Sequence, residues 1–443
     1  MMEIAITGVG LATARGGAHD LGREASPPVA MPWHPARMYR PLRGNDLTGH
    51  ARLAASLRAA LAECGGSGPI VAASCNGGAA SFAEDDWRAS FEIEHAPVAS
   101  AACASGMHAL YLARQLIAAG APEVRVVAGD ITTPPCHANF EALRVLSDEP
   151  APFQPDASGF MLGEAAVALR LVPAARAPGA PRLIGPLLGH DLDGDDGIAR
   201  ALAALGSHAP ELVIGQGAGA AEADRAELAA LASRVAGDVP LATALHGFGH
   251  TLGASSLLSV ALAVLARDAT LDVLGGPARV ALDGRPLGAG RSQRTTVVCR
   301  ALGGACGACF VGDGTAVARR LAWGPRSSLP PLRDRVLRAV VAAADRERSA
   351  EPPDLVIVTL DAPLPPSARI GSRILPTSVL EMTPGQLPQL IARAWGYPGP
   401  AVCLVGGDPL PLLAACRATH ERVYRIAIRG MPGSDDRDIE WNA

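Results

Sequence analysis

The sequence predicts an α/β protein built from three consecutive parts. Short apolar runs rich in β-branched residues alternate with Ala- and Leu-rich stretches of helical periodicity, and this alternation is typical of α/β folds. A Pro- and Ala-rich stretch at 173–186 and a Gly-, Pro- and Ser-rich stretch at 323–331 are typical of connections between folded units. They divide the 443-residue chain into residues 1–172, 173–322 and 323–443.

The expected strands and helices follow this alternation from the first residues onward. Glycines end two of the helical stretches, at Gly65 and Gly120, as is common at helix C-termini. The expected helices are 52–64, 105–119, 220–235 and 252–266. The expected strands are 4–8, 69–73, 124–128, 165–171, 212–215 and 295–300.

The third part resembles a portion of the first. Pro97–Cys103 and Pro400–Gly406 are alike in sequence, and each is followed by a helical pattern and then by a strand-like run. In this alignment Gly406 takes the position of Cys103. We interpret residues 323–443 as a degenerate half-repeat, with a chance likeness of two strand–turn–helix units as the alternative.

Composition excludes several classes of function. Hydrophobic residues make up 49% of the chain and charged residues 19%, so a large core can form. A net charge of −4 and 4% aromatic residues provide neither the basic patch nor the stacking surface that nucleic acid requires. The chain shows no secretory signal, no apolar run of about 18 residues that could span a membrane, and no disulfide framework among its nine cysteines. We therefore expect a cytoplasmic protein that binds neither nucleic acid nor membranes.

The segment Ser100–Leu110 places a cysteine between an expected strand and an expected helix. Cys103 follows a run of small residues, and Gly106 permits a tight turn at the start of the helix. The positive end of a helix lowers the pKa of a thiol, and the backbone N–H at such a turn can face a developing oxyanion. Cys103 is therefore the candidate nucleophile; the alternative is a small, buried structural cysteine.

Six motifs along residues 1–315 occur in a characteristic order. They are Ile4–Gly10 (IAITGVG), Ala102–Gly106 (ACASG), Phe140–Ser147 (FEALRVLS), Pro152–Ala165 (PFQPDASGFMLGEA), Gly249–Ala254 (GHTLGA) and Ala301–Gly304 (ALGG). In this order they resemble the β-ketoacyl-[acyl-carrier-protein] synthase family of the thiolase-like superfamily. The resemblance implies a thiolase-like layered αβαβα core, with residues 323–443 as an additional C-terminal α/β half-domain that lacks the nucleophile.

The resemblance implies an active site that departs from the family pattern. It implies that Cys103 accepts an acyl group and that His250 assists the chemistry. A second family histidine is replaced by Gln216, and a family lysine, five residues before His250, by Leu245. Glutamine donates a hydrogen bond but acts neither as a cation nor as a general base at neutral pH. We therefore expect decarboxylative condensation to be impaired.

The motif Ala301–Gly304 is expected to border the nucleophile. Leu302 occupies the position of a gatekeeper phenylalanine in the family, with Gly303 beside it. The backbone N–H groups of Cys103 and Leu302 are the expected oxyanion donors. No metal or redox cofactor is expected, because the Cys306–Cys309 pair lacks the second pair of cysteines that a zinc site of this type needs.

Three functions are compatible with these residues. The first is acyl transfer from an acyl-carrier-protein thioester through an acyl-Cys103 intermediate, in fatty-acid or polyketide biosynthesis. The second is a true condensing synthase, and the third is a catalytically silent partner subunit similar to a chain-length factor. The resemblance implies an acyl carrier protein as partner, and a homodimer or a heterodimer with another ketosynthase-like subunit, formed through the strand and helix around the nucleophile.

Overall fold

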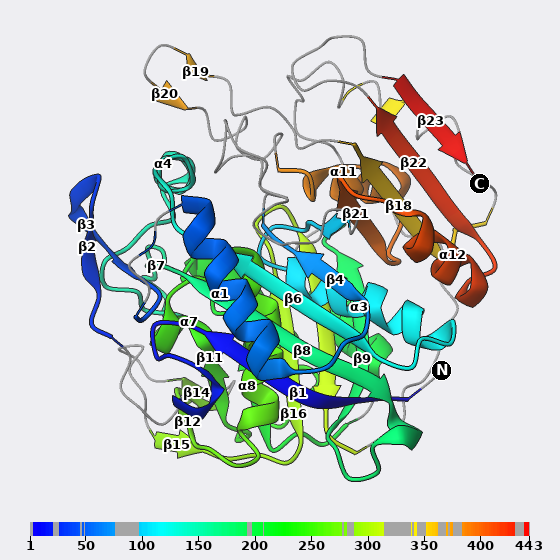
Figure 1. Ribbon diagram of the computed structural model, residues 1–443. Helices are drawn as coiled ribbons and strands as arrows, with labels where there is room; N and C mark the ends of the chain where they lie inside the picture. Colours follow the sequence, from blue (N-terminus) through cyan, green and yellow to red (C-terminus); the bar gives the residue numbers. More distant parts are fainter. Residues whose placement is uncertain are drawn as a thin grey trace.

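The structure is a computed structural model. It describes residues 3–20, 26–44, 47, 49–75, 97–192, 197–206, 208–276, 279–280, 288–313, 338, 341–342, 351–361, 369–370, 373–374, 383–429 and 438–442. Among these residues, sixteen strands form one mixed sheet that bends back over itself, and helices cover its faces (Figure 1). The predicted α/β class is confirmed. The predicted connection at 323–331 lies outside the described residues.

The N-terminal half contributes five adjacent strands to this sheet. Their order is β5 (Val98–Ala99), β4 (Ile70–Ala73), β6 (Val124–Asp130), β8 (Ala165–Pro173) and β1 (Ile4–Ala12). Strand β4 runs parallel to both β5 and β6, whereas β8 runs antiparallel to β6 and to β1. The strand that leads to Cys103 is therefore at the edge of this five-stranded group.

A second group of five strands has the same arrangement. Its order is β11 (Leu241–Thr243), β10 (Leu212–Gly215), β16 (Thr295–Arg300), β17 (Ala305–Val311) and β9 (Arg182–His190). Strand β10 is parallel to β11 and β16, and β17 is antiparallel to β16 and β9. The two groups join where β1 pairs with β9, at Ile4 and Leu183. The predicted connection at 173–186 is too long, because β8 extends to Pro173 and β9 begins at Arg182.

The third part of the chain adds four strands in a corresponding order. They are β21 (Ala401–Val405), β18 (Leu355–Leu360), β22 (Val423–Arg429) and β23 (Asp438–Asn442). Strand β18 is parallel to β21 and β22, and β23 is antiparallel to β22. This is the pattern of β5, β4, β6 and β8, and we call residues 351–442 the tail.

The helices form layers on and between the two five-stranded groups. Helix α1 (Gly49–Cys64) packs on β1, β6 and β8, and helix α5 (Gly197–Leu205) packs on β9 and β17. Between the groups lie α3 (Ser105–Ala118) and α8 (Ser255–Leu265), which contact each other. The predicted layered αβαβα arrangement is thus present.

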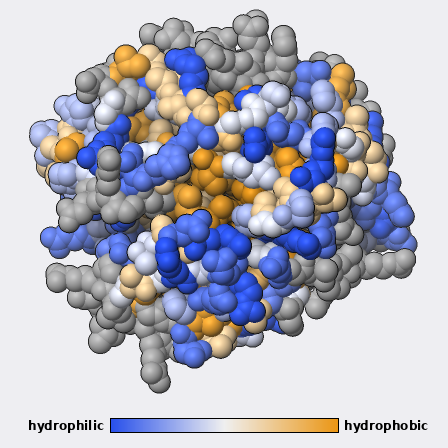
Figure 2. Space-filling model, turned by 60° about the horizontal axis from the view of Figure 1, so that its bottom comes forward, coloured by the Kyte–Doolittle hydropathy of each residue, from blue (hydrophilic) through white to orange (hydrophobic). Residues whose placement is uncertain are grey.

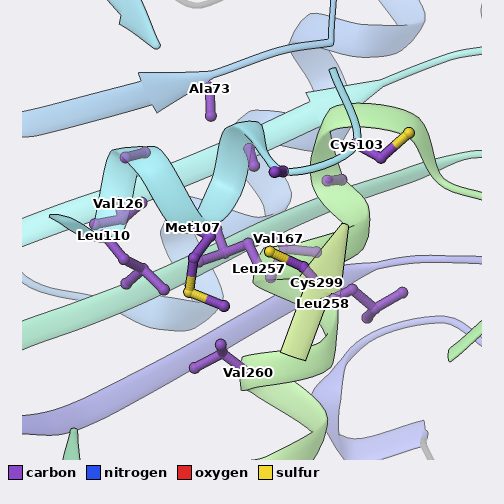
Figure 3. Packing of buried hydrophobic residues seen from close by; sticks show 14 of the residues in the cluster. Ala73, Cys103, Met107, Leu110, Val126, Val167, Leu257, Leu258, Val260 and Cys299 are labelled. Carbon is purple, nitrogen blue, oxygen red and sulfur yellow. The ribbon is translucent and has the colours of Figure 1, made fainter. Parts of the chain in front are cut away.

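The middle layer is tightly packed and positions the nucleophile. A Cβ on Gly106 would lie 2.6 Å from Leu257 Cβ, so only a glycine allows α3 and α8 to approach this closely. Figure 3 shows Cys103 at the turn before α3, with Met107 and Leu110 packed toward α8 and the sheet. All three side chains belong to the largest buried cluster.

The remaining elements are short or peripheral. Other helices among the described residues are α4 (Pro134–Leu143), α6 (Ala221–Ala232), α7 (Ala244–Phe248), α11 (Gln386–Trp395) and α12 (Leu410–Thr419), with single 3-10 turns at Ala18–Asp20, Ala174–Arg176 and Leu252–Ala254. The small strands are β2 (Val29–Met31), β3 (His34–Arg40), β7 (Leu162–Gly163), β12 (Leu271–Val273), β13 (Gly275–Gly276), β14 (Arg279–Val280), β15 (Gly288–Gly290), β19 (Arg369–Ile370) and β20 (Arg373–Ile374).

Most expected elements are confirmed with small shifts at their ends. The stretch predicted as a helix at 252–266 begins with a 3-10 turn and becomes α8 only at Ser255.

On the face in Figure 2, apolar residues gather in a central band between hydrophilic regions. Within the described ranges, no helix is both long and apolar enough to cross a membrane.

Candidate active site

Cys103 lies at a strained turn between β5 and α3. Ala102 has a φ of 50°, in the left-handed region that costs a non-glycine residue roughly 1 kcal/mol. Ser105 holds the turn: its Oγ accepts a hydrogen bond from the Ala101 N–H at 2.8 Å and lies 2.6 Å from the Ala102 carbonyl oxygen. Backbone strain that the surrounding structure maintains is typical of functional sites. The local geometry therefore favours the interpretation of Cys103 as a nucleophile over that of a packing residue.

A small cavity of about 30 Å³ opens beside Cys103. Its walls come from the end of β4, the nucleophile turn, helix α4, the loop after β16 and the start of α11 in the tail. The lining residues are Cys75, Ala102, Cys103, Cys136, Asn139, Phe140, Leu143, Leu302, Thr383 and Gln386. A cavity of this size holds one or two water molecules, so a long acyl chain would require side chains such as Phe140 to move.

The thiol of Cys103 is influenced by opposing effects. Burial raises its pKa to about 12, while hydrogen bonds from the backbone N–H groups of Leu302 and of Cys103 itself lower it. The lowering expected from the start of the helix is therefore outweighed, because desolvation of a buried thiolate has the larger effect on the pKa of Cys103. Near neutral pH the side chain is a thiol that faces two backbone N–H groups.

His250 lies close to the cavity but does not line it. Its imidazole stacks on Phe160 at a centroid distance of 4.2 Å and lies 6.2 Å from the ring of Phe140, which does line the cavity. Its Nδ1 accepts a hydrogen bond from the Leu252 N–H at 3.2 Å, so any proton on the neutral ring is at Nε2. Burial lowers the pKa of His250 to about 4, so the ring is neutral at pH 7.

Gln216 lies at a turn after β10, above two buried carboxyl groups. Its backbone N–H donates to Glu227 Oε1 at 2.7 Å, and its side-chain Oε1 is buried without a hydrogen-bond partner. Burial, and then the charge of Asp224, raise the pKa of Glu227 to about 8. The turn meets the segment that carries Phe160, because Ala220 bridges to Ser158. The structure thus connects Gln216 to the His250 region through backbone contacts, and direct contact with Cys103 stays a prediction.

Two further residues were predicted for the site, Leu245 and Gly303, and Gly303 is the one that lies next to a cavity residue. Leu245 is buried in α7 and belongs to the same hydrophobic cluster as Cys103, but it does not line the cavity. Gly303 directly follows the cavity residue Leu302, and its φ of 100° lies in a region that favours glycine. A role in binding substrate stays a prediction for both residues.

The most informative residues missed from the sequence are Thr383 and Gln386. Both come from the tail, and both line the cavity beside Cys103. No motif marks them in the sequence, and only the likeness between the first and third parts of the chain hinted that the tail would meet the nucleophile segment. Within the described ranges, no group of three or more His, Cys, Asp or Glu side chains is placed to hold a metal ion.

Comparisons with known proteins match the segment that carries Cys103. The family model described as "Beta-ketoacyl synthase, N-terminal domain" matches residues 95–177, which include Cys103. A curated relative, 3-oxoacyl-[acyl-carrier-protein] synthase 2 of Rhizobium meliloti (strain 1021), is 32% identical over 198 residues. That match spans 37% of this chain and slightly less than half, 46%, of the relative.

Solved structures with similar folds include ketosynthases. A β-ketoacyl synthase from Burkholderia phymatum STM815 matches with a TM-score of 0.58 and 20% identity, over 72% of this chain and 100% of its own. The structure named "PfaC Keto synthase-Chain length factor" matches with a TM-score of 0.69 and 13% identity, over 97% of this chain and 74% of its own. The structure that contains a chain-length factor therefore matches about a quarter more of this chain than the single synthase does.

The motif order, the repeated five-stranded groups and the matched domain at residues 95–177 all lead to one assignment. Over the matched residues the chain is similar to the β-ketoacyl synthases, and its fold is the thiolase-like fold of the solved ketosynthases.

Proposed function

We propose that the protein is an acyltransferase of the ketosynthase type that takes an acyl group from a carrier-protein thioester onto Cys103. The observation that carries this proposal is the placement of Cys103 at a strained turn, beside a cavity and facing two backbone N–H groups. Such donors stabilise the oxyanion that forms when a thioester carbonyl is attacked. The name of the matched curated relative supports an acyl carrier protein as the partner.

The transfer step requires only groups that lie around the cavity. The sulfur of Cys103 attacks the thioester carbonyl, and the tetrahedral oxyanion accepts hydrogen bonds from the N–H groups of Cys103 and Leu302. The intermediate collapses as the bond to the carrier's phosphopantetheine sulfur breaks. The proton lost by Cys103 ends on that departing thiol, so the products are acyl-Cys103 and a free carrier thiol. The small cavity favours a short acyl group.

Decarboxylation of a malonyl extender places a further demand on the site. Loss of carbon dioxide creates an enolate whose oxygen needs charged or strongly donating partners. Gln216 supplies a neutral amide in place of an imidazole, and burial keeps His250 neutral at pH 7. We therefore assign the protein to fatty-acid or polyketide biosynthesis as an acyl-loading enzyme that elongates slowly or not at all.

The tail takes the position of a partner subunit within this proposal. Strand β5, which leads to the nucleophile, pairs antiparallel with β21, and α3 packs against α12. Strand β5 and helix α3 are the elements around the nucleophile through which the resemblance implied a dimer. The 97% coverage by a paired ketosynthase and chain-length factor supports a half-domain that replaces the partner in the same chain.

Intact-protein mass spectrometry tests the loading reaction. The protein is incubated with acetyl-, butyryl- and malonyl-carrier proteins, and carbon dioxide release from the malonyl form is measured in parallel. We expect the acyl mass on wild type, no added mass on Cys103→Ala, and slow carbon dioxide release. Gln216→His should accelerate the release, because it restores an imidazole donor at that position.

The other two functions make distinct predictions in the same assay. Fast carbon dioxide release with a condensed product would identify a true synthase. Absence of both loading and release with every carrier would identify a silent partner and contradict the proposal.

A further inference from the structure

The tail contacts the nucleophile segment along its whole length. Before the turn, β21 pairs with β5, with Leu404 opposite Ala99, and the Ser100 N–H donates to the Cys403 carbonyl at 3.0 Å. After the turn, Tyr111 of α3 hydrogen-bonds to His420 Nε2 at the end of α12 over 2.8 Å. The strand, the turn and the helix that carry Cys103 therefore all rest on residues after 380.

The start of α11 makes the closest approach to the turn itself. Gly385, which caps this helix, lies against the backbone of the nucleophile turn: a Cβ there would overlap Ala101 Cα and lie 2.7 Å from the Ser100 carbonyl oxygen. Gly385 has helical dihedral angles, so space alone demands a glycine. This approach delivers the next residue, Gln386, into the cavity beside Cys103.

Gln386 fixes the loop that supplies one of the two expected oxyanion donors. Its Nε2 donates to the Leu302 carbonyl oxygen at 2.8 Å, and its side-chain amide lies so close to Gly303 that a Cβ there would overlap it. Gly303 and Gly304 both have positive φ angles, 100° and 96°. Two successive glycines leave the chain free to rotate unless tertiary contacts hold it.

We propose that Gln386 is a positioning residue that holds the Leu302 N–H toward the sulfur of Cys103. This inference rests on the proposed acyl transfer and extends it to the tail. The Leu302 carbonyl and the Leu302 N–H flank the same Cα, so fixing the carbonyl restricts the direction of the N–H. Among the described residues, the side chain that donates to the Leu302 carbonyl comes from the tail, so the site is complete only with the tail in place.

The same helix provides a matched control. Gln389 lies one turn after Gln386, is also buried, and hydrogen-bonds to His190 Nδ1 away from the cavity. Replacing either glutamine by methionine keeps the length of the side chain and removes its polar amide. A role limited to docking α11 predicts similar effects of Gln386→Met and Gln389→Met, whereas positioning predicts a difference between them.

Two measurements on the full-length protein separate these cases. The first is the rate of acyl loading from acetyl-carrier protein, resolved into kcat and KM. The second is hydrogen exchange of the peptide that contains residues 301–304, which needs no activity. We expect Gln386→Met to lower kcat about tenfold, a fraction of the roughly 10²–10³ that loss of an oxyanion donor costs. KM should be unchanged, exchange at 301–304 should be faster, and Gln389→Met should leave kcat and exchange at wild-type values.

Two outcomes would overturn the inference: wild-type kcat and exchange in Gln386→Met, or equal losses in both methionine variants. If wild type does not load at all, the proposed function fails, and the exchange measurement still decides whether Gln386 holds the loop. If Gln386→Met does not fold, Gln386→Glu is assayed relative to wild type at several pH values. A protonated carboxyl donates to Leu302 as the amide does, so its loading rate should recover on acidification; a pH-independent deficit would contradict positioning.

Discussion

The buried thiol of Cys103 predicts a slow and strongly pH-dependent reaction with alkylating agents. With a pKa of about 12, roughly one molecule in 10⁴–10⁵ carries the thiolate near pH 7.5, compared with about one in ten for a free cysteine. The lower thiolate fraction costs about 10³–10⁴ in rate, and the greater nucleophilicity of the more basic thiolate recovers about 10–100. Alkylation should therefore be about 10² slower than that of an unstructured peptide with the same local sequence.

The assay measures iodoacetamide modification of Cys103 by peptide mass spectrometry between pH 6 and 9. Mapping is necessary because all nine cysteines are free and buried, and Cys103→Ala supplies the blank. The logarithm of the rate should rise by about one per pH unit without levelling off, because the whole range lies below the pKa. A plateau above pH 7 would show that the helix and the backbone donors affect the pKa of Cys103 more than burial does, and it would refute the reasoning.

Three further predictions concern stability and assembly. Glu164 forms a buried ion pair with Arg52 at 2.7 Å, so Glu164→Gln should lower the free energy of unfolding in urea by about 2–4 kcal/mol; a change below about 0.5 kcal/mol would contradict this. Burial raises the pKa of Glu227 to about 8, so its contribution to stability is present below about pH 4.5 and is lost as pH rises toward 8; Glu227→Gln should weaken the fall in unfolding free energy between pH 5 and 8, and an unchanged fall would exclude Glu227 as its source. Because β21 already occupies the edge of β5, light scattering should give the monomer mass of 45.2 kDa; a stable dimer that survives disruption of this pairing would place the contact elsewhere.

The sequence was sufficient for the fold because its signals are local. Runs such as Leu212–Gly215 are apolar along their length, as strands buried on both faces require, and helix α3 ends beside Gly120 as predicted. The periodicity of apolar residues predicts the strands and helices but not how they are layered. The layered arrangement was predicted from the order of the motifs, through the resemblance that they carry. The prediction was wrong at 173–186, where proline and alanine suggested a long connection but β9 begins inside the stretch. Arg182 and Leu183 are drawn into the sheet by pairing with β1 and β17, and such tertiary pairing leaves no local signal.

The chemistry of the site was less predictable because it depends on burial. Helix position predicted an effect that lowers the pKa of Cys103, but only the three-dimensional structure shows that the thiol is buried and that burial outweighs this effect. His250 likewise carries a family motif in sequence, whereas its stacking on Phe160 and its neutral state follow from packing. Gln386 has no sequence signal, since its importance arises from the backbone approach at Gly385, more than 280 residues from Cys103.

The shared core explains why the tail can act as a permanent partner. Apolar residues of the tail, such as Ile357 and Leu404, belong to the same buried cluster as Cys103 and Met107. Other buried residues of the tail, such as Trp395 and Ile426, pack in a second cluster with Leu57 of the N-terminal half. Among the described residues the tail therefore has no separate core. Covalent connection also replaces a concentration-dependent association by an intramolecular one, with effective concentrations that reach the millimolar range for short links. A half-domain that keeps only the strands and helices next to the nucleophile is enough to retain this support, because β21, α11 and α12 supply the contacts to β5, the turn and α3.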